Sequence, residues 1–352
     1  MPPRQRTTIH DVAALAGVSR SAVSKAMNGK TGLAPATRER ILSAAEALSW
    51  SPSPAASTLR GSRTRSVGLV ISRGPDLLTA DAYFAVVIAG AESVLAPQRY
   101  GLQLHLLTGS QTAEADVYRQ LVRDRRVDGF ILTESRIRDA RFELLRDLDI
   151  PFVLIGEPWG KEQVTHVQPQ DAMAGLIQLA QHLVAAGHQR ILYIGGPDDF
   201  VHTGQRREKF VRAIEAAGGP TPSVVSAAFD ADDARKATRA ALARPDRPTA
   251  IAYGNDTMAI AGQSEAQRLG FSVPRDLAIV GYDSLPMGEW VFPTITTVAQ
   301  DLHGLGAAAA SALLRELGDE TVSIPPVADS QLIIRESTQQ QTYSEPPGSP
   351  QV

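Results

Sequence analysis

The chain has 352 residues, a formal net charge of −3 and no cysteine. That length allows two or three domains, and the lack of cysteine excludes disulfides and thiolate metal sites. No apolar run is long enough to span a bilayer, and residues 1–6 have no apolar stretch behind their charges. The sequence therefore predicts a cytoplasmic chain with no signal peptide and no membrane partner.

Charge is distributed unevenly along the chain. Residues 1–65 contain ten Lys or Arg and three Asp or Glu, whereas the remaining residues contain 25 basic and 35 acidic side chains. A small basic segment attached to an acidic remainder is typical of a unit that binds phosphates. The alternative is a solvated basic tail, which the pattern of the next segment disfavours.

Residues 8–29 have the pattern of two short helices joined by a tight turn. Thr8 and Asp11 form a Thr-x-x-Asp helix start, in which the carboxylate can accept the threonine N–H. Gly17 stands where the first helix must end, a position that often needs a positive φ, and Ser19 can cap the second helix. The polar side chains of the second helix face outward, as in the helix-turn-helix motif that reads a DNA major groove. They are Arg20, Ser21, Ser24, Lys25 and Asn28.

A third helix is predicted over residues 31–48, with Pro35 near its start, where a missing N–H is tolerated. The three helices form a head over residues 1–50, near the lower size limit for independent folding. Residues 51–66 are rich in Ser, Pro, Ala and Arg, which predicts a hinge linker with one helical turn over residues 55–60. Because so short a helix is unstable alone, we expect DNA or a second copy of the chain to order it.

Residues 67–336 alternate apolar strands with helices of 10–15 residues, which predicts an α/β fold with parallel sheets. Two successive series indicate two lobes, at about 67–160 plus 295–336 and at about 161–294. Residues 337–352 are rich in Gln, Ser and Pro and are predicted to be a disordered tail. The expected strands cover 67–71, 102–107, 129–132, 152–155, 191–195, 224–227, 250–253, 277–282, 294–298 and 331–334. The expected helices cover 85–96, 113–123, 138–145, 172–186, 205–217, 233–243, 257–269 and 305–317.

Several motifs follow one another at consistent spacing from about residue 7 to residue 335. They are the stretch over 8–19, Thr37-Arg38-Glu39-Arg40-Ile41, His182-Leu183 with Gly187-His188, Ile194-Gly195-Gly196-Pro197, Asn255-Asp256-Thr257-Met258-Ala259, Pro274 with Ile279-Val280-Gly281-Tyr282-Asp283, and Pro293-Thr294-Ile295-Thr296-Thr297-Val298. Their order and spacing resemble the lac-repressor/galactose-repressor family of bacterial transcriptional regulators.

This resemblance implies a three-helix helix-turn-helix head, a short hinge helix and a two-lobed core similar to periplasmic binding proteins. It implies a homodimer that binds a palindromic double-stranded DNA operator and is associated with the nucleoid. The chain would be a ligand-responsive regulator, most simply a repressor, controlled by a small-molecule effector in the inter-lobe cleft. A sugar or sugar derivative is the first candidate effector. The alternatives are a nucleobase or other non-sugar metabolite, and a sugar-binding receptor without DNA function. Inducer and corepressor modes are both compatible with the sequence.

The resemblance also assigns DNA contacts. Base contacts fall on Arg20, Ser21 and Lys25, and Arg and Lys favour guanine O6 and N7. The alternative is that these cations touch phosphates only. The hinge-leucine position is Leu59, where an apolar side chain can enter the minor groove, unless it rests on a lobe instead. Phosphate contacts are expected from Thr8, Ser19, Ser24 and Asn28. Two departures from the family are Ala34 in place of a capping serine and Ser57 in place of a hinge arginine.

Positions that line the cleft in the family correspond here to Ser72, Tyr83, Phe84, Arg206, Phe229, Asn255, Asp283 and Leu302. We expect Arg206 and Asp283, on loops at the carboxyl ends of strands, to hold a polyol or a nucleobase, with aromatic faces covering its apolar side. The alternatives are a structural ion pair for these two residues and plain core packing for Tyr83 and Phe229. Gly156 replaces an acidic residue common in the family, and Glu157 and Trp159 are further candidates.

No catalytic pattern is found. The seven histidines are scattered, and the sequence contains neither a P-loop nor a Gly-x-Ser-x-Gly elbow. The glycine-rich residues 304–309 do not join a strand to a helix, so they indicate a closely packed helix and not a dinucleotide site. We therefore expect no enzyme activity, no metal and no cofactor.

Overall fold

The structure is a computed structural model, and it describes residues 7–27, 31–50, 63–73, 82–108 and 111–339. The chain divides into two compact units, Met1–Thr64 and Arg65–Val352. Asn28, Ser57 and Leu59 lie outside the described residues, so what the sequence predicts for them stays a prediction. Among the described residues, no helix is long and apolar enough to cross a membrane.

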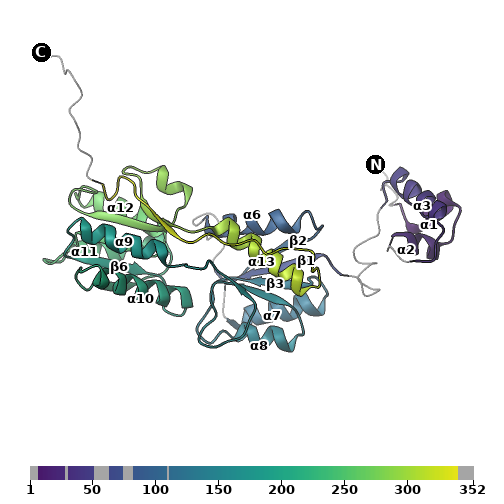
Figure 1. Cartoon of the computed structure of the whole chain (residues 1–352), viewed down its shortest axis with the longest axis horizontal. Helices are drawn as coiled ribbons and strands as arrows, with labels where there is room; N and C mark the ends of the chain where they lie inside the picture. Colours follow the sequence, from purple (N-terminus) through teal and green to yellow (C-terminus); the bar gives the residue numbers. More distant parts are fainter. Residues whose placement is uncertain (1–6, 28–30, 51–62, 74–81, 109–110, 340–352) are drawn as a thin grey trace, which may run out of the picture. The chain divides into compact units, whose positions relative to one another are not determined.

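The N-terminal unit is built from three helices (Figure 1), which pack around a small apolar core. They are α1 (Ile9–Ala16), α2 (Arg20–Met27) and α3 (Pro35–Ala47). Val12, Val23 and Ile41 contribute one fully buried side chain from each helix. Leu15 of α1 is exposed, because the buried stripe of that helix passes through Val12, Ala13 and Ala16.

The predicted start and stop signals of these helices are confirmed. The Thr8 N–H donates to Asp11 Oδ2 at 2.7 Å, and the Thr8 hydroxyl donates to the same oxygen at 2.8 Å. Gly17 ends α1 with a φ of 63°, in the left-handed region that favours glycine. The Ala22 N–H donates to Ser19 Oγ at 3.3 Å, so this serine caps α2.

The first lobe is a five-stranded parallel sheet with helices on both faces (Figure 1). Its strand order is β2-β1-β3-β4-β5. The strands are β1 (Ser66–Ile71), β2 (Gly101–Leu106), β3 (Gly129–Leu132), β4 (Phe152–Ile155) and β5 (His166–Val167). One face is covered by α6 (Tyr83–Leu95) and α13 (Leu302–Glu316), and the other by α7 (Gln111–Arg123) and α8 (Ala140–Asp147). Coverage of both faces explains why β1, β3 and β4 are continuous apolar runs.

The second lobe is a six-stranded sheet in the order β11-β10-β9-β8-β6-β7, parallel except for the β10–β11 pair. The strands are β6 (Ile191–Gly195), β7 (Ser223–Ser226), β8 (Ala250–Tyr253), β9 (Ala278–Asp283), β10 (Thr296–Ala299) and β11 (Gln331–Ile333). One face is covered by α9 (Ala174–Ala185) and α10 (Val201–Ala216), and the other by α11 (Ala231–Leu242) and α12 (Asp256–Arg268). The predicted α/β class with two lobes and a helix-turn-helix head is confirmed.

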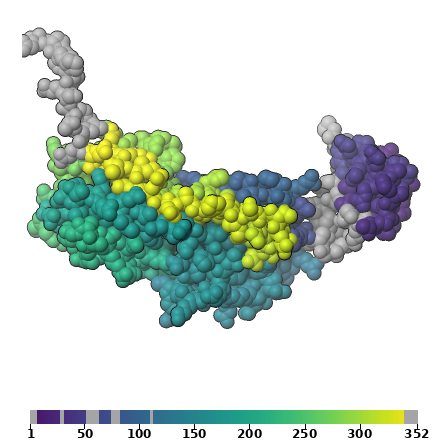
Figure 2. Space-filling view, in the orientation of Figure 1, coloured from purple at the N-terminus to yellow at the C-terminus, as the bar shows by residue number. Residues whose placement is uncertain are grey.

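The predicted lobe boundaries need correction. Residues 295–336 were assigned to the first lobe, but only α13 lies there, because β10 pairs with β9 and β11 pairs with β10 in the second sheet. Residues 161–294 were assigned to the second lobe, but β5 is the edge strand of the first sheet. The chain thus passes between the lobes after β5, after β10 and after α13. In Figure 2 the C-terminal segment, in yellow, runs across both lobes.

The tail prediction also begins too early. Ser337 is fully buried, and its hydroxyl donates to the Ile279 carbonyl at 2.6 Å and accepts the Thr296 N–H at 2.8 Å. The serine therefore bridges β9 and the start of β10 in the second sheet. Such a contact across 58 residues of sequence is not visible in local composition.

Candidate functional site

The second helix of the head presents a polar face to solvent. Arg20, Ser21 and Lys25 are exposed, whereas Val23 and Ala26 on the opposite face of α2 are buried in the head core. Nη1 of Arg20 lies 3.3 Å from Nε2 of His10 on α1, so the two helices share a polar contact at this face. A short helix that exposes two cations in this way has the dimensions and the donors to read base edges in a major groove.

Two further contacts fix this unit. Nη1 of Arg38, on α3, donates to the Ala26 carbonyl at 3.0 Å and so satisfies a carbonyl in the last turn of α2. At the other end of the motif, the hydrogen bonds from Thr8 lower the pKa of Asp11. Thr8 and Ser19 are exposed and Ser24 is half-buried, and the phosphate contacts expected of them remain predictions.

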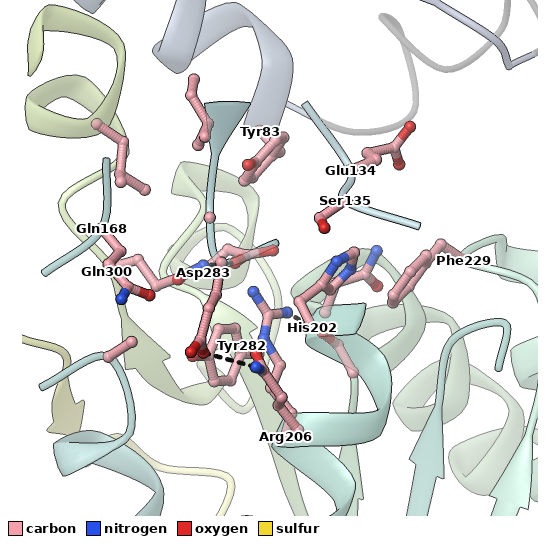
Figure 3. Close-up of a pocket in the computed structure, with 18 of the residues that line it drawn as sticks. Tyr83, Glu134, Ser135, Gln168, His202, Arg206, Phe229, Tyr282, Asp283 and Gln300 are labelled. Carbon is pink, nitrogen blue, oxygen red and sulfur yellow. Dashed lines mark hydrogen bonds between the residues drawn. The ribbon is translucent and has the colours of Figure 1, made fainter. Parts of the chain in front are cut away.

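A pocket lies between the two lobes, where the carboxyl ends of strands from both sheets meet (Figure 3). The first lobe supplies Arg73 after β1, Glu134 and Ser135 after β3, and Gly156 and Glu157 after β4. The second lobe supplies Gly254 and Asn255 after β8, Tyr282 and Asp283 at the end of β9, and His202, Gln205 and Arg206 on α10. Open α/β sheets bind their ligands at this edge.

One end of the pocket is built around Arg206. The guanidinium carbon lies 3.9 Å from the centre of the Tyr282 ring, and Nη1 donates to the Gly254 carbonyl at 3.4 Å. Burial acts to lower the pKa of Arg206, but the neighbouring Tyr282 and Asp283 outweigh it, so the pKa is raised. Gln300 Nε2 donates to Asp283 Oδ1 at 2.6 Å. This end therefore offers a fixed cation, a carboxylate and an amide to a bound molecule.

The backbone at Asp283 is strained, and hydrogen bonds to the side chains of Asp256 and Thr297 hold the turn that follows it. Asp283 and Ser284 have φ values of 99° and 55°, which residues other than glycine rarely adopt. The buried carboxylate of Asp256 accepts the Leu285 N–H at 2.6 Å and the Thr297 hydroxyl at 2.7 Å. The same hydroxyl accepts the Ser284 N–H at 3.2 Å. Asp256 therefore holds the turn that aims the Asp283 carboxylate into the pocket.

The other end of the pocket combines an aromatic stack with a buried ion pair. The His202 ring lies between those of Phe200 and Phe229, with ring centres 5.6 and 5.8 Å apart. The Arg73 guanidinium lies about 5 Å from both phenylalanine rings and is paired with the Glu134 carboxylate. Burial, helped by the charges of Arg206 and Arg73, holds the pKa of His202 well below its usual range, so the imidazole is neutral.

Glycines allow the aromatic stack to form. A Cβ at Gly196 would lie 2.0 Å from the Phe229 ring, so the strand-end motif Gly195-Gly196 leaves the space that this ring occupies. A Cβ at Gly254 would lie 3.2 Å from the same ring. The glycines of two neighbouring strand ends thus serve the placement of one aromatic side chain.

The lobes contact each other beside this end of the pocket. Ile137 N–H donates to the Asp199 carbonyl and Val201 N–H donates to the Ser135 carbonyl, both at 2.9 Å. Farther along, Gln205 Nε2 donates to Glu157 Oε2 at 2.7 Å. These bonds join two loops of the first lobe to the start of α10, so the two lobes are in direct contact on this side of the pocket.

Six of the residues expected in the cleft do line the pocket. They are Tyr83, Phe84, Arg206, Phe229, Asn255 and Asp283. Arg206 lies in the second turn of α10 and not on a loop, because this helix begins at Val201, four residues before its predicted start. Asn255 Oδ1 accepts the Met258 N–H at 2.8 Å, so the asparagine also caps α12.

Two expected residues lie elsewhere. Ser72 follows β1 but is not among the described residues that line the pocket, where its neighbour Arg73 stands instead. Leu302 is buried in the core of the first lobe at the start of α13, and Leu305, one turn later, lines the pocket. Both leucines lie on one face of α13, because residues three apart share a helix face, but only Leu305 is among the described residues that line the pocket.

Sequence reasoning missed much of the first-lobe side of the pocket. Glu134 and Ser135 come directly after a buried strand, and His202 lies one turn before Arg206, so both positions carried a detectable signal. Gln300 carried none, because it reaches Asp283 only through the pairing of β9 with β10. Among the described residues, no group of three or more His, Asp or Glu side chains is placed to hold a metal ion.

A groove-reading head followed by two α/β lobes around a polar pocket defines a DNA-binding transcription regulator that responds to a small molecule. Residues 8–53 match the family model described as "Bacterial regulatory proteins, lacI family". Residues 180–338 match the model of a periplasmic binding protein-like domain. The chain belongs to the lacI family, as the motif order predicted.

Relatives along the whole chain agree. The HTH-type transcriptional regulator CelR of Thermobifida fusca is 34% identical over 96% of this chain and 100% of its own length. The HTH-type transcriptional repressor PurR of Vibrio vulnificus is 31% identical, over 89% of this chain and 92% of its own. A structure of a CelR–cellobiose complex is 31% identical with a TM-score of 0.71, covering 94% of this chain and 100% of that one. The lac repressor dimer bound to operator and ONPF shares the fold, with a TM-score of 0.80 at 23% identity, covering 95% and 99%.

Proposed function

We propose that this regulator represses transcription as a homodimer on a two-fold symmetric operator, and that a sugar bound between the lobes sets its affinity for DNA. The observation that carries the sugar assignment is the polar lining at both ends of the pocket. Arg206, Asp283 and Gln300 lie at one end, and Glu134 and Ser135 at the other. Converging donors and acceptors of this kind suit a neutral polyol. The cellobiose-bound relative supports this choice.

The aromatic side chains favour a sugar over a nucleobase. A planar base is held mainly by stacking on a free aromatic face. The Phe229 ring is covered by His202, by the Arg73 guanidinium and by the backbone at Gly196, all from the chain itself. Recognition at this end of the pocket therefore depends on hydrogen bonds more than on stacking. We take cellobiose as the first candidate effector.

The effector assignment is tested by thermal unfolding of the full chain with cellobiose, glucose and free purine bases. A ligand that binds only the folded protein raises the unfolding midpoint by mass action. We expect cellobiose to raise it. A rise with a purine base and none with either sugar would instead favour the nucleobase alternative.

The DNA-binding half is tested by a gel shift with genomic fragments at increasing salt. Contacts to phosphates release counterions, so we expect binding that weakens steeply as the salt concentration rises. Absence of binding to every fragment would favour a sugar receptor without DNA function.

Exposed aromatic side chains support the dimer, because Trp290 and Phe292 are 77% and 67% exposed on the second lobe and such side chains are enriched at interfaces.

A further inference from the structure

We infer that Ser135 is a specificity-determining effector contact, whose hydroxyl binds a hydroxyl group of the sugar at the end of the pocket away from Asp283. This inference rests on the proposed function, since it concerns the sugar proposed to occupy the pocket. It adds a residue of the first lobe that the family motifs do not mark.

The Ser135 hydroxyl is buried and unpaired. The residue is 3% exposed, and its Oγ has no hydrogen-bond partner among the described residues. A buried hydroxyl without a partner costs free energy, and such a group in a folded protein commonly serves a ligand or a bound water. Ser135 also lines the pocket, where Figure 3 shows it between Glu134 and His202.

The loop that carries Ser135 is fixed on both sides. The Ser135 carbonyl accepts the Val201 N–H at 2.9 Å from the second lobe. Before it, the Glu134 carbonyl accepts a hydrogen bond from Arg141 at 3.0 Å, and after it, Arg136 pairs with the buried Glu114 at 2.6 Å. The hydroxyl is therefore already positioned when a ligand arrives, so little ordering of the loop opposes binding.

The surroundings of Ser135 select an uncharged ligand group. Glu134 is already paired with Arg73, and His202 is neutral. A charged group of a ligand at this end would therefore be buried without a counterion. A serine hydroxyl both donates and accepts, and its best complement is another hydroxyl. A neutral, polyhydroxylated sugar unit meets both conditions.

Thr203 provides a matched control. Its Oγ1 is also buried without a hydrogen-bond partner among the described residues, and the residue is 2% exposed. It lies in the first turn of α10, across the lobe contact from Ser135, but it is not among the described residues that line the pocket. Removal of either hydroxyl thus removes the same chemical group, and only one of the two is placed to meet a ligand.

The experiment is isothermal titration of cellobiose into the full chain and into Ser135→Ala, Thr203→Val and Arg206→Ala. We expect Ser135→Ala to weaken cellobiose binding by about 2- to 10-fold, the loss of one neutral hydrogen bond. The unfolding midpoint of ligand-free Ser135→Ala is expected to equal or exceed that of the wild type, because an unpaired buried hydroxyl has been removed. Thr203→Val should leave cellobiose binding unchanged.

The outcomes separate this contact from the proposed function. If Arg206→Ala loses cellobiose and Ser135→Ala binds it as tightly as the wild type, the Ser135 contact is wrong and the sugar site stands. If Thr203→Val weakens binding as much as Ser135→Ala, the effect comes from packing between the lobes, which also overturns the contact. If the wild type itself does not bind cellobiose, the cellobiose assignment and this contact are both wrong.

Discussion

Arg136 of the first lobe and Phe200 of the second form an antiparallel β-bridge across the cleft. The two backbone hydrogen bonds that flank it, at 2.9 Å each, make Arg136 and Phe200 the non-hydrogen-bonded pair of the bridge. The same loop carries Glu134 and Ser135 into the pocket. The lobe contact and the effector contacts therefore share one segment, which gives a bound molecule a direct means of favouring one lobe arrangement.

The bridge predicts a disulfide that locks the lobes. Cα atoms of a non-hydrogen-bonded pair lie about 4.5 Å apart, within the span of a disulfide, and the chain has no cysteine of its own. We expect oxidised Arg136→Cys/Phe200→Cys to take up added cellobiose at least about tenfold more slowly, because the open form that admits ligand is no longer freely populated. Reduction should restore the rate. Stopped-flow measurement of binding before and after a reductant, with each single variant as control, measures the effect. Equal association rates in both redox states would contradict a closing role for the bridge.

Arg206 should not tolerate replacement by lysine. Its guanidinium lies over the Tyr282 ring while it donates to the Gly254 carbonyl, and an ammonium group cannot do both. We expect Arg206→Lys to weaken effector binding about 10- to 100-fold, the range for a hydrogen bond to a charged group. Arg207→Lys is the matched control, because Arg207 pairs with Asp198 at the surface. Titration calorimetry on both variants decides, and a similar loss in the two would point to a general effect on α10.

Asp256 should make stability depend on pH. Burial, with help from the charge of Asp283, raises its pKa to about 7 against the opposing hydrogen bond from Thr297. The folded chain then binds this proton more tightly than the unfolded chain. The resulting stabilisation is complete below about pH 4 and is lost as the pH rises to about 7. Over that range, the free energy of unfolding of the wild type should fall by up to about 4 kcal/mol from this group. Asp256→Asn should not show this fall, because asparagine does not titrate. Denaturant titrations across the range test this, and parallel pH profiles for the two proteins would rule it out.

Arg20 and Lys25 are predicted to read base pairs. Each good bidentate contact to a guanine discriminates by about 1–3 kcal/mol. We expect Arg20→Ala and Lys25→Ala to relax preference at particular positions of a randomised operator. Arg40→Ala, an exposed cation on α3, removes the same charge away from α2 and should weaken all sequences alike. Selection and sequencing of bound duplexes measures the preference. Uniform weakening by all three substitutions would assign Arg20 and Lys25 to phosphates.

The exposed aromatic pair predicts the location of the dimer contact. We expect Trp290→Ser with Phe292→Ser to shift the chain from dimer to monomer in sedimentation velocity, because the two substitutions remove large apolar side chains from an exposed surface. Leu42→Ser removes an exposed leucine from the head and serves as the control. A dimer that survives the double substitution unchanged would place the contact elsewhere.

Local signals were enough to predict the head. The Thr8–Asp11 start, the glycine stop at Gly17 and the Ser19 cap all act within a few residues of each other, and each is present in the structure. The alternation of strands and helices likewise predicted two α/β lobes. The strands β10 and β11 were assigned to the wrong lobe because pairing partners depend on contacts between distant segments.

The pocket was predicted where the family resemblance marks a position, as for Arg206 and Asp283, although Arg206 lies on α10 and not on a loop. It was missed where a weak local signal gains its meaning from three-dimensional neighbours. His202 lies one turn before Arg206 but is one of seven scattered histidines in the sequence, and the stack with Phe200 and Phe229 makes its place in the site clear. Ser135 follows a buried strand, and it stands out once its hydroxyl is found buried and without a partner among the described residues.

Control of operator binding by the pocket is the central claim, and fluorescence anisotropy tests it most directly. An operator duplex selected from genomic fragments is titrated with the full chain, with and without saturating cellobiose, and Arg206→Lys is measured beside the wild type. We expect cellobiose to change the operator affinity of the wild type by about 5- to 150-fold, the usual range of coupling between two sites. At the same sugar concentration, Arg206→Lys should show little or no change. An operator affinity of the wild type that is the same with and without cellobiose would show that cellobiose in the pocket does not control operator binding.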